Sequence, residues 1–229
     1  MTFSEKIISF LGDLEFKGSL PEGVSIMNPF SDNPQIMPVV SQFYTRFYND
    51  DNPRYIILGI NPGRFGAGVT GIPFTDTKRL FEKCNIVIPG LQTFEPSSVF
   101  VYEMIDAYGG AEKFYSYFYI SAVSPLGFTA LGKKGKSVNY NYYDSKKLTD
   151  AVYDFIIGSL NTQLKFGIRR DVCFCLGTGK NYDFILNMNN KYRVFNKIVP
   201  LEHPRYIMQY KTKLKHHYIA KYIDEFSKL

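Results

Sequence analysis

The chain of 229 residues is 45% apolar and 21% charged, which is enough for one domain with a well-filled core. This composition excludes a disordered tail, a collagen-like fibre and a small disulfide-stapled protein. No apolar run approaches the roughly 18 residues of a membrane span, and the N-terminal residues lack the apolar segment and cleavage site of a signal peptide. We therefore expect a cytoplasmic protein with no membrane partner. The net charge of +6 is compatible with a polyanionic partner but does not establish one.

Cysteine and histidine are scarce in this chain. The three cysteines contain no CxxC pair, cannot all pair within the chain and are compatible with a reducing compartment. They are fewer than the four thiolates that an iron–sulfur cluster or a Cys-only zinc site takes, and only three histidines accompany them. We expect neither a metal nor another cofactor.

Helix signals begin at the N-terminus. Thr2 and Glu5 have the spacing of a capping box, and apolar residues follow at helical intervals. A second helix is predicted after Pro38, where valine and aromatic side chains share one stripe. Further helices are predicted over residues 145–160 and 180–189, and over residues 214–229, where an apolar stripe is expected to enter the core.

Four short apolar runs, rich in β-branched residues, predict buried strands. They cover residues 55–58, 118–123, 172–176 and 197–201. Because helical segments separate them, the strands are expected to connect through right-handed crossovers into a mostly parallel sheet. We therefore predict an α/β fold, a three-layer α/β/α sandwich formed by a single domain over residues 1–229. The loops after the four strands then lie along one edge of the sheet, where ligand clefts form.

The loop after the first strand, residues 59–74, reads GINPGRFGAGVTGIPF and contains five glycines. Glycines at this density let backbone N–H groups approach a ligand closely, although a tight structural turn is the alternative. The Gly-Lys-Ser/Thr of a Walker phosphate loop is missing, and Pro62 interrupts the spacing of a dinucleotide fingerprint. The polar Asn61 at the strand end and Phe74 at the far end of the loop favour a ligand-binding loop over a purely structural turn.

Residues 59–74 resemble, without a gap, the first motif of the single-strand-selective monofunctional uracil-DNA glycosylases, GMNPGPFGMAQTGVPF. The dipeptide His203-Pro204, after the last strand, resembles the second motif of that family. Weaker similarity follows in the same order at residues 28–30, 119–126 and 176–179. The chain thus resembles the uracil-DNA glycosylase superfamily. Within this superfamily, a resemblance to the second, bacterial branch is one alternative. Separately, the composition, rich in Tyr, Asn, Lys and Ile, is typical of an AT-rich bacterial genome.

The resemblance implies a site in which Asn61 positions the attacking water and His203 donates a hydrogen bond to O2 of the departing base. Phe74 would stack on the flipped base, and backbone amides around Gly63 and Phe65 would form the pocket floor. The departing pyrimidine gains negative charge, so a donor aimed at that charge in a dry cleft contributes strongly to catalysis. The implied mechanism is dissociative, without a covalent lysine intermediate and without a metal.

One position departs from the family. Where the family strand has His-Asn-Leu-Cys-Pro-Leu, residues 121–126 read SAVSPL, and the asparagine that pairs with uracil falls on Ala122. The base contact is then either missing or supplied by Ser124, Ser121 or another residue. Its loss would either admit other deaminated bases, such as xanthine and hypoxanthine, or abolish activity.

The segment after His203 is a candidate DNA contact. In the superfamily this loop wedges into the base stack, and apolar side chains suit that role. The candidate wedges are Tyr206, Ile207 and Met208, with Arg205 as a candidate phosphate contact, although some of these side chains could instead pack against the final helix. Further candidate phosphate contacts, for which a solvated surface is the alternative, are Lys133, Lys134, Lys136 and Lys180.

These observations predict a monomeric DNA repair enzyme that works at the bacterial nucleoid. It would hydrolyse the N-glycosidic bond of flipped-out uracil in single- or double-stranded DNA and leave an abasic site. A non-catalytic nucleic-acid or base-binding module on the same fold is the alternative, because Ala122 lacks an amide. A third possibility, an α/β protein acting on a small nucleotide, is disfavoured by the basic charge and the candidate wedge.

Overall fold

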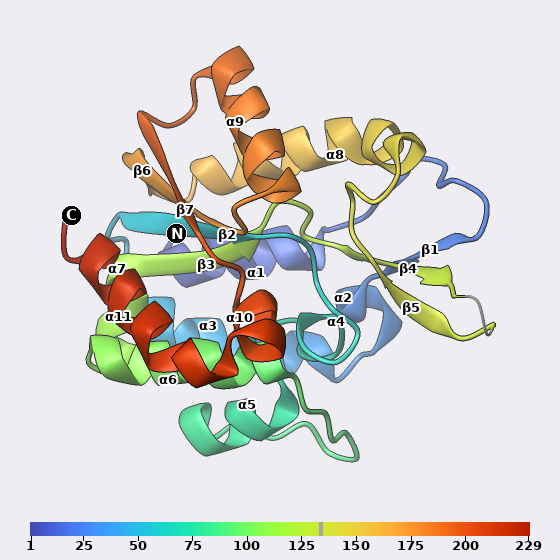
Figure 1. Ribbon diagram of the computed structural model, residues 1–229. Coiled ribbons are helices and arrows are strands. Elements are labelled where there is room, and N and C mark those ends of the chain that lie inside the picture. The colour runs from blue at the N-terminus through green and yellow to red at the C-terminus, as the bar shows by residue number, and fades with distance from the viewer. Residues whose placement is uncertain (133–134) are drawn as a thin grey trace.

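The centre of the fold is a sheet of four parallel strands in the order β3-β2-β6-β7 (Figure 1). The computed structural model describes residues 1–132 and 135–229. The strands are β2 (Arg54–Gly59), β3 (Phe118–Ala122), β6 (Ile168–Leu176) and β7 (Lys197–Leu201). Ile120, Ile57, Phe174 and Val199 form one buried row across all four. Apolar strands of this kind are typical of a sheet covered on both faces, and the predicted α/β sandwich is confirmed.

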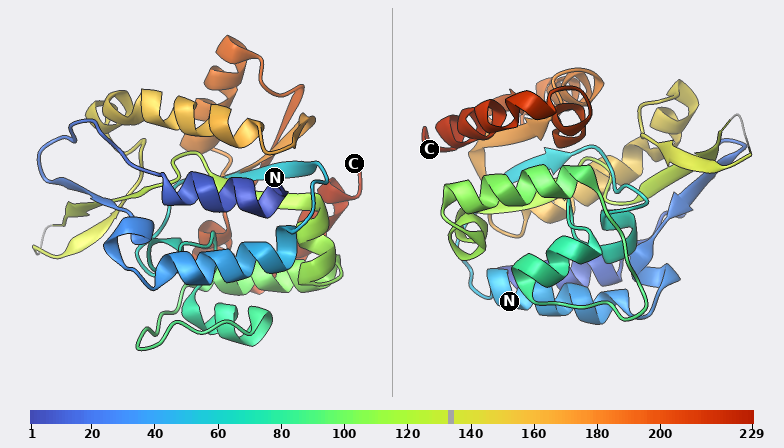
Figure 2. Two further views of the ribbon diagram at one scale, coloured as in Figure 1. Left: turned by 180° about the vertical axis from the view of Figure 1, so that it is seen from behind. Right: turned by 60° about the horizontal axis from the view of Figure 1, so that its bottom comes forward.

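Helices cover both faces of this sheet (Figures 1 and 2). One layer contains α8 (Lys146–Leu164) and α9 (Lys180–Tyr192). The opposite layer contains α3 (Ile36–Tyr48), α6 (Pro96–Tyr108), α7 (Ala111–Tyr117), α10 (Pro204–Tyr210) and α11 (Lys215–Phe226). At the β3 edge of the sheet, α1 (Phe3–Gly12) contacts both α3 and α8. The remaining short helices are α2 (Pro29–Asp32), α4 (Ala67–Thr70), α5 (Thr77–Cys84) and the 3-10 helix η1 (Thr212–Leu214).

A smaller antiparallel sheet extends from one side of the sandwich (Figure 1). Its strands, in spatial order, are β1 (Val24–Met27), β4 (Gly127–Leu131) and β5 (Ser137–Tyr140). The sequence did not predict this sheet, because its strands are short, and much of each is half-buried or exposed rather than part of a continuous apolar run. The sheet brings the end of β5 to the glycine-rich loop, where the backbone N–H of Arg64 donates to Asn139 Oδ1 at 3.0 Å.

The predicted helices are present, with shifted ends. The capping box of Thr2 and Glu5 starts α1. Helix α3 begins before Pro38, which lies in its first turn, where proline is tolerated because those N–H groups have no intrahelical partner. The expectation that the whole C-terminal stripe is core is wrong at both ends, since Leu214 is 52% and Leu229 is 43% exposed. Among the described residues, no helix has both the length and the apolar character needed to cross a membrane.

Candidate active site

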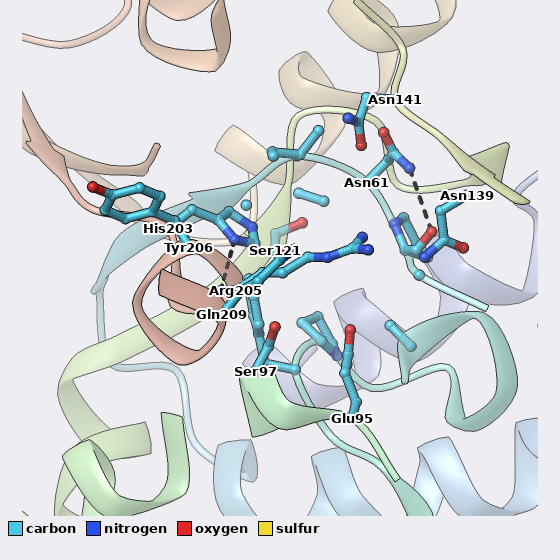
Figure 3. Close-up of a pocket in the computed structure, with 18 of the residues that line it drawn as sticks. Asn61, Glu95, Ser97, Ser121, Asn139, Asn141, His203, Arg205, Tyr206 and Gln209 are labelled. Carbon is cyan, nitrogen blue, oxygen red and sulfur yellow. Dashed lines mark hydrogen bonds between the residues drawn. The ribbon is translucent and has the colours of Figure 1, made fainter. Parts of the chain in front are cut away.

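A cavity of about 340 Å³, here called the pocket, opens at the carboxyl edge of the parallel sheet (Figure 3). Its walls come from the glycine-rich loop after β2, from the ends of β2, β3 and β5, from the segment after β7, from the start of α6 and from α10. This volume is in the range of small-molecule sites. The polar side chains along it include Asn61, Glu95, Ser97, Asn139, Asn141, His203, Arg205 and Gln209.

Asn61 follows β2, and hydrogen bonds hold its amide in one orientation. Its Oδ1 accepts from the backbone N–H of Tyr142 at 3.1 Å. Its Nδ2 donates to the carbonyl of Tyr140 at 3.3 Å and to that of Pro62 at 3.4 Å. Because a backbone N–H can only donate, the amide oxygen must face Tyr142, and its second lone pair is left for a water molecule.

Tyr142 connects Asn61 to the interior. Its buried hydroxyl donates to Oδ1 of Asn181, at the start of α9, at 2.8 Å. The Nδ2 of Asn181 donates in turn to the carbonyls of Leu176 at 3.1 Å and Gly59 at 3.4 Å. These hydrogen bonds fix the carboxyl ends of β6 and β2 relative to the segment that orients Asn61.

His203 is the N-cap of α10 and comes directly after β7. Its Nδ1 accepts a hydrogen bond from the backbone N–H of Arg205 at 3.1 Å, so the proton of the neutral ring is on Nε2. Burial lowers the pKa of His203 to about 4, and the positive charge of Arg205 adds to this effect. The imidazole is therefore neutral at physiological pH and carries its single N–H donor at Nε2, in the wall of the pocket.

Phe74 forms the wall beside this imidazole. The two ring centroids are 5.6 Å apart, with the planes tilted by 51°. Phe74 has a φ of 52°, in the left-handed region that phenylalanine rarely adopts. A Cβ on Gly59 would lie 3.0 Å from the Phe74 ring, so the ring packs directly on the backbone at the end of β2. Rare backbone geometry of this kind concentrates at functional sites.

The other predicted base contacts are only partly in the pocket. Gly63 lines it, whereas Phe65 is outside the set of described lining residues. The Phe65 side chain is 49% exposed, and its ring centroid is 4.5 Å from the Arg64 guanidinium. The prediction for Ser124 is corrected: its side chain is fully buried and its hydroxyl donates to the carbonyl of Leu126 at 2.8 Å, so it turns inward instead of toward the pocket.

Strand β3 contributes little hydrogen-bonding capacity from its side chains to the pocket. The Ser121 hydroxyl is engaged with Gln163 Oε1, to which it donates at 2.6 Å. The next residue, Ala122, lines the pocket with a methyl group. The wall formed by the end of β3 therefore offers little to which a polar ligand could bind.

The segment after His203 is a helix, α10, rather than the expected loop. Ile207 is fully buried, which does not fit the prediction that it wedges into DNA, whereas Met208 is half-buried against the core and its role as a wedge stays a prediction. Their side chains lie on the face of α10 that packs inward. Tyr206 is 43% exposed and lines the pocket together with Arg205, whose side chain extends across it in Figure 3.

The predicted lysine contacts are dispersed. Lys180 is the exposed first residue of α9, and its Nζ lies 5.9 Å from the ring centroid of Tyr143, which lines the pocket. Lys136 is exposed in the turn before β5. Lys133 and Lys134 lie outside the residues that the structure describes.

The sequence analysis missed several residues that line the pocket, among them Glu95 and Asn139. Glu95 is half-buried at the N-cap of α6. Burial, reinforced by the Asp76 carboxylate, raises the pKa of Glu95 to about 7, and the charge of Arg205 opposes this rise. Asn139 belongs to the unpredicted strand β5. Neither lies in a motif, and the only sequence signal was the polar character of residues 137–141.

The fold and the site define a glycosylase of the uracil-processing type. The family model of the uracil DNA glycosylase superfamily matches residues 45–227, and the chain belongs to this superfamily. It is a monofunctional uracil-DNA glycosylase, a hydrolase of N-glycosidic bonds that acts on DNA. Within the part of the chain that the structure describes, no group of three or more His, Cys, Asp or Glu side chains is placed to hold a metal ion.

A solved structure resembles the whole chain. It is the crystal structure of wild-type SMUG2 from Pedobacter heparinus, which is 58% identical to this chain in sequence. The two superpose with a TM-score of 0.97, and the match covers 100% of this chain and 98% of the other. The comparison with curated proteins gave no match. The family predicted from the two sequence motifs is confirmed.

Proposed function

We propose that this enzyme, acting as a monomer, removes flipped-out uracil from DNA by direct attack of water on C1′ of the sugar. The observation that supports this most directly is the neutral His203 imidazole, with its proton on Nε2, in the same pocket as the oriented amide of Asn61. One group can stabilise the leaving base and the other can orient the nucleophile.

In the proposed reaction, the bond between C1′ and N1 of uracil breaks first, which leaves positive charge on the sugar and negative charge on the base. The Nε2–H of His203 donates to O2, where that negative charge develops. A single preorganised donor of this kind contributes on the order of 3–4 kcal/mol. Because the neutral His203 ring donates a hydrogen bond and keeps its proton on Nε2, the reaction requires no proton transfer from His203. It also requires no covalent intermediate.

Water then adds to C1′. The free lone pair of Asn61 Oδ1 accepts one hydrogen bond from this water and aims its oxygen at the sugar. Because an amide is a very weak base, the water proton passes to the departing base or to solvent, and bond breaking must be well advanced before attack. The products are an abasic site and free uracil.

Phe74 and α10 support the flipped nucleotide in this proposal. The Phe74 ring offers an apolar face on which the base can stack, beside the imidazole. Arg205 in the pocket wall and Lys180 on α9 contact phosphates, and Tyr206 replaces the extruded base by stacking on its neighbour. Base flipping costs a few kcal/mol, which such contacts offset.

The substrate range is proposed to extend to xanthine and hypoxanthine. Ala122 leaves space in the pocket wall, and the cavity of about 340 Å³ is roomy for one pyrimidine ring. The variant Ala122→Asn should therefore reduce removal of both purines more than removal of uracil, because the larger side chain fills the space that a second ring needs.

The test is a gel assay in chelator with oligonucleotides that carry one uracil, xanthine or hypoxanthine, followed by alkali to break abasic sites. The wild-type enzyme should release uracil. Asn61→Ala should lose about 100-fold in excision rate, because the attacking water is no longer positioned. The control variant Asn190→Ala, on the exposed face of α9, should match the wild-type rate. DNA binding without any strand breaks in wild type would favour the binding-module alternative and reject the proposal.

A further inference from the structure

Two side chains unexplained by the mechanism above flank one backbone position of the pocket. A Cβ on Gly63 would lie 3.3 Å from Glu95 Oε1 and 3.6 Å from Asn139 Nδ2. Figure 3 shows both side chains directed toward the cavity that His203 and Asn61 share. Since Ala122 contributes only a methyl group, this pair is the best candidate for recognition of the base edge.

The amide of Asn139 has a fixed orientation. Its Oδ1 accepts the backbone N–H of Arg64 at 3.0 Å, which leaves the NH₂ group on the side of Gly63. A backbone donor cannot pair with an NH₂ group, so the amide cannot turn over without losing this hydrogen bond. Asn139 is therefore a dedicated donor, suited to a carbonyl oxygen of a ligand.

The carboxyl group of Glu95 fits closely against the glycine-rich loop. A Cβ on Gly66 would overlap with Glu95 Oε2, so the loop has room for the carboxyl only because residue 66 is glycine. The charged groups around it are Asp76 and Arg79 from α5, which form an ion pair at 3.2 Å, and Arg205 from α10. Asp76 also accepts the Glu95 backbone N–H at 2.7 Å, so a second carboxylate lies beside this group.

We propose that the neutral carboxylic acid of Glu95 and the NH₂ group of Asn139 together recognise the edge of the flipped base that carries a ring N–H beside a carbonyl, an edge that uracil, xanthine and hypoxanthine share. The inference rests on the proposed function of the pocket. A neutral acid offers a carbonyl that accepts the ring N–H and a hydroxyl that donates to a neighbouring carbonyl, which is the hydrogen-bonding pattern of a carboxamide. Asn139 adds a second donor for the carbonyl side. Cytosine, with an amino group and an unprotonated ring nitrogen, lacks this pattern.

The neutral form is required for an electrostatic reason. The departing base gains negative charge, and a carboxylate in the same low-dielectric pocket would repel it. Burial and Asp76 hold the pKa of Glu95 at about 7, so the acid form is present at neutral pH and is lost as the pH rises. The pKa of His203, about 4, is too low for that residue to cause such a loss.

The test compares wild type, Glu95→Gln and Glu95→Ala in single-turnover excision of uracil between pH 5.5 and 9. Wild-type rates should fall above pH about 7, approaching tenfold per unit. Glu95→Gln should keep neutral-pH activity and abolish this fall. Glu95→Ala should be about 10- to 100-fold slower than wild type between pH 5.5 and 7 and should also lack the fall at higher pH. The matched control Glu82→Gln, on the exposed side of α5, should keep the wild-type profile.

Asn139 is tested by a substitution that preserves its structural hydrogen bond. In Asn139→Asp the Oδ1 acceptor for Arg64 remains, the NH₂ donor is lost and a negative charge is added, so a drop of about 10-fold or more in uracil excision is expected. Asn139→Ala should show the same drop, and Asn190→Asp is the control. Thermal unfolding of each variant separates loss of recognition from loss of folding.

The outcomes distinguish this inference from the proposed function. An inactive wild type would reject the proposed function itself. If the wild type is active, the proposed function stands and three results would reject the inference alone. The first is full activity in Glu95→Ala or Asn139→Asp. The others are a Glu95→Gln variant as impaired as Glu95→Ala, or a fall at high pH that persists in Glu95→Gln.

Discussion

The pocket has two halves with different origins. Asn61 and His203 follow the ends of parallel strands, and the Phe74 ring packs on the end of β2; these three residues, here called the strand-end half, belong to short stretches with a recognisable pattern. Glu95, at the N-cap of α6, and Asn139, on the unpredicted strand β5, are single polar residues with no pattern around them. A pocket residue could therefore be recognised in the sequence where it belongs to a motif, whichever element carries it, and not where it stands alone.

The largest expected effect on the excision rate comes from a substitution of His203 in the strand-end half of the pocket. His203→Ala removes the donor to the leaving base and should slow uracil excision by about 10²- to 10³-fold, as measured under single-turnover conditions. His216→Ala, on exposed α11, should keep the wild-type rate. A rate within a factor of about two of wild type in His203→Ala would remove His203 from the mechanism.

The next effect concerns the free energy of unfolding, which should depend on the inner face of α10 and not on its outer face. Ile207→Ala leaves a cavity under the helix that begins at His203, and the free energy of unfolding should fall by about 2–5 kcal/mol. Urea denaturation measures this change. Unchanged stability together with weakened DNA binding would restore Ile207 as a wedge.

The outer face of α10 should behave in the opposite way. Tyr206→Ala should leave the free energy of unfolding nearly unchanged, since the side chain is 43% exposed. It should weaken binding to DNA with a non-cleavable uracil analogue by about 10-fold, because one base-stacking platform is lost. Fluorescence anisotropy at fixed salt would show this, and equal affinity would exclude Tyr206 from the interface.

The smallest expected effect tests the hydrogen bonds that lie behind Asn61. Tyr142→Phe removes the donor to Asn181 but keeps the backbone N–H that orients Asn61. We expect a loss of about 1 kcal/mol in stability and a smaller loss of excision rate than in Asn61→Ala. Tyr182→Phe, on α9, is the control. A rate loss equal to that of Asn61→Ala would mean that the hydroxyl itself orients the water.

Much of the fold could be predicted because its strands are continuous apolar runs, such as the one that contains Ile57. The small antiparallel sheet could not, since strands like β5 are half exposed and carry no apolar run. The segment after His203 was expected to be a loop because the resembling superfamily has a loop there, whereas Pro204 occupies the first position of α10, where proline is favoured. The partners of Asn61 could not be predicted, because Tyr142 lies 81 positions away.

The short helix α10 has a consequence for obtaining improved variants of this enzyme. Its N-cap is the imidazole in the pocket wall, and Tyr206, three residues later, belongs to the same rigid segment. A substitution that shifts the axis of α10 therefore displaces both groups, and turnover and DNA affinity change together. Selection for tighter binding alone would have to alter the solvent-facing side chains of α10 and retain Ile207, whose burial anchors the helix.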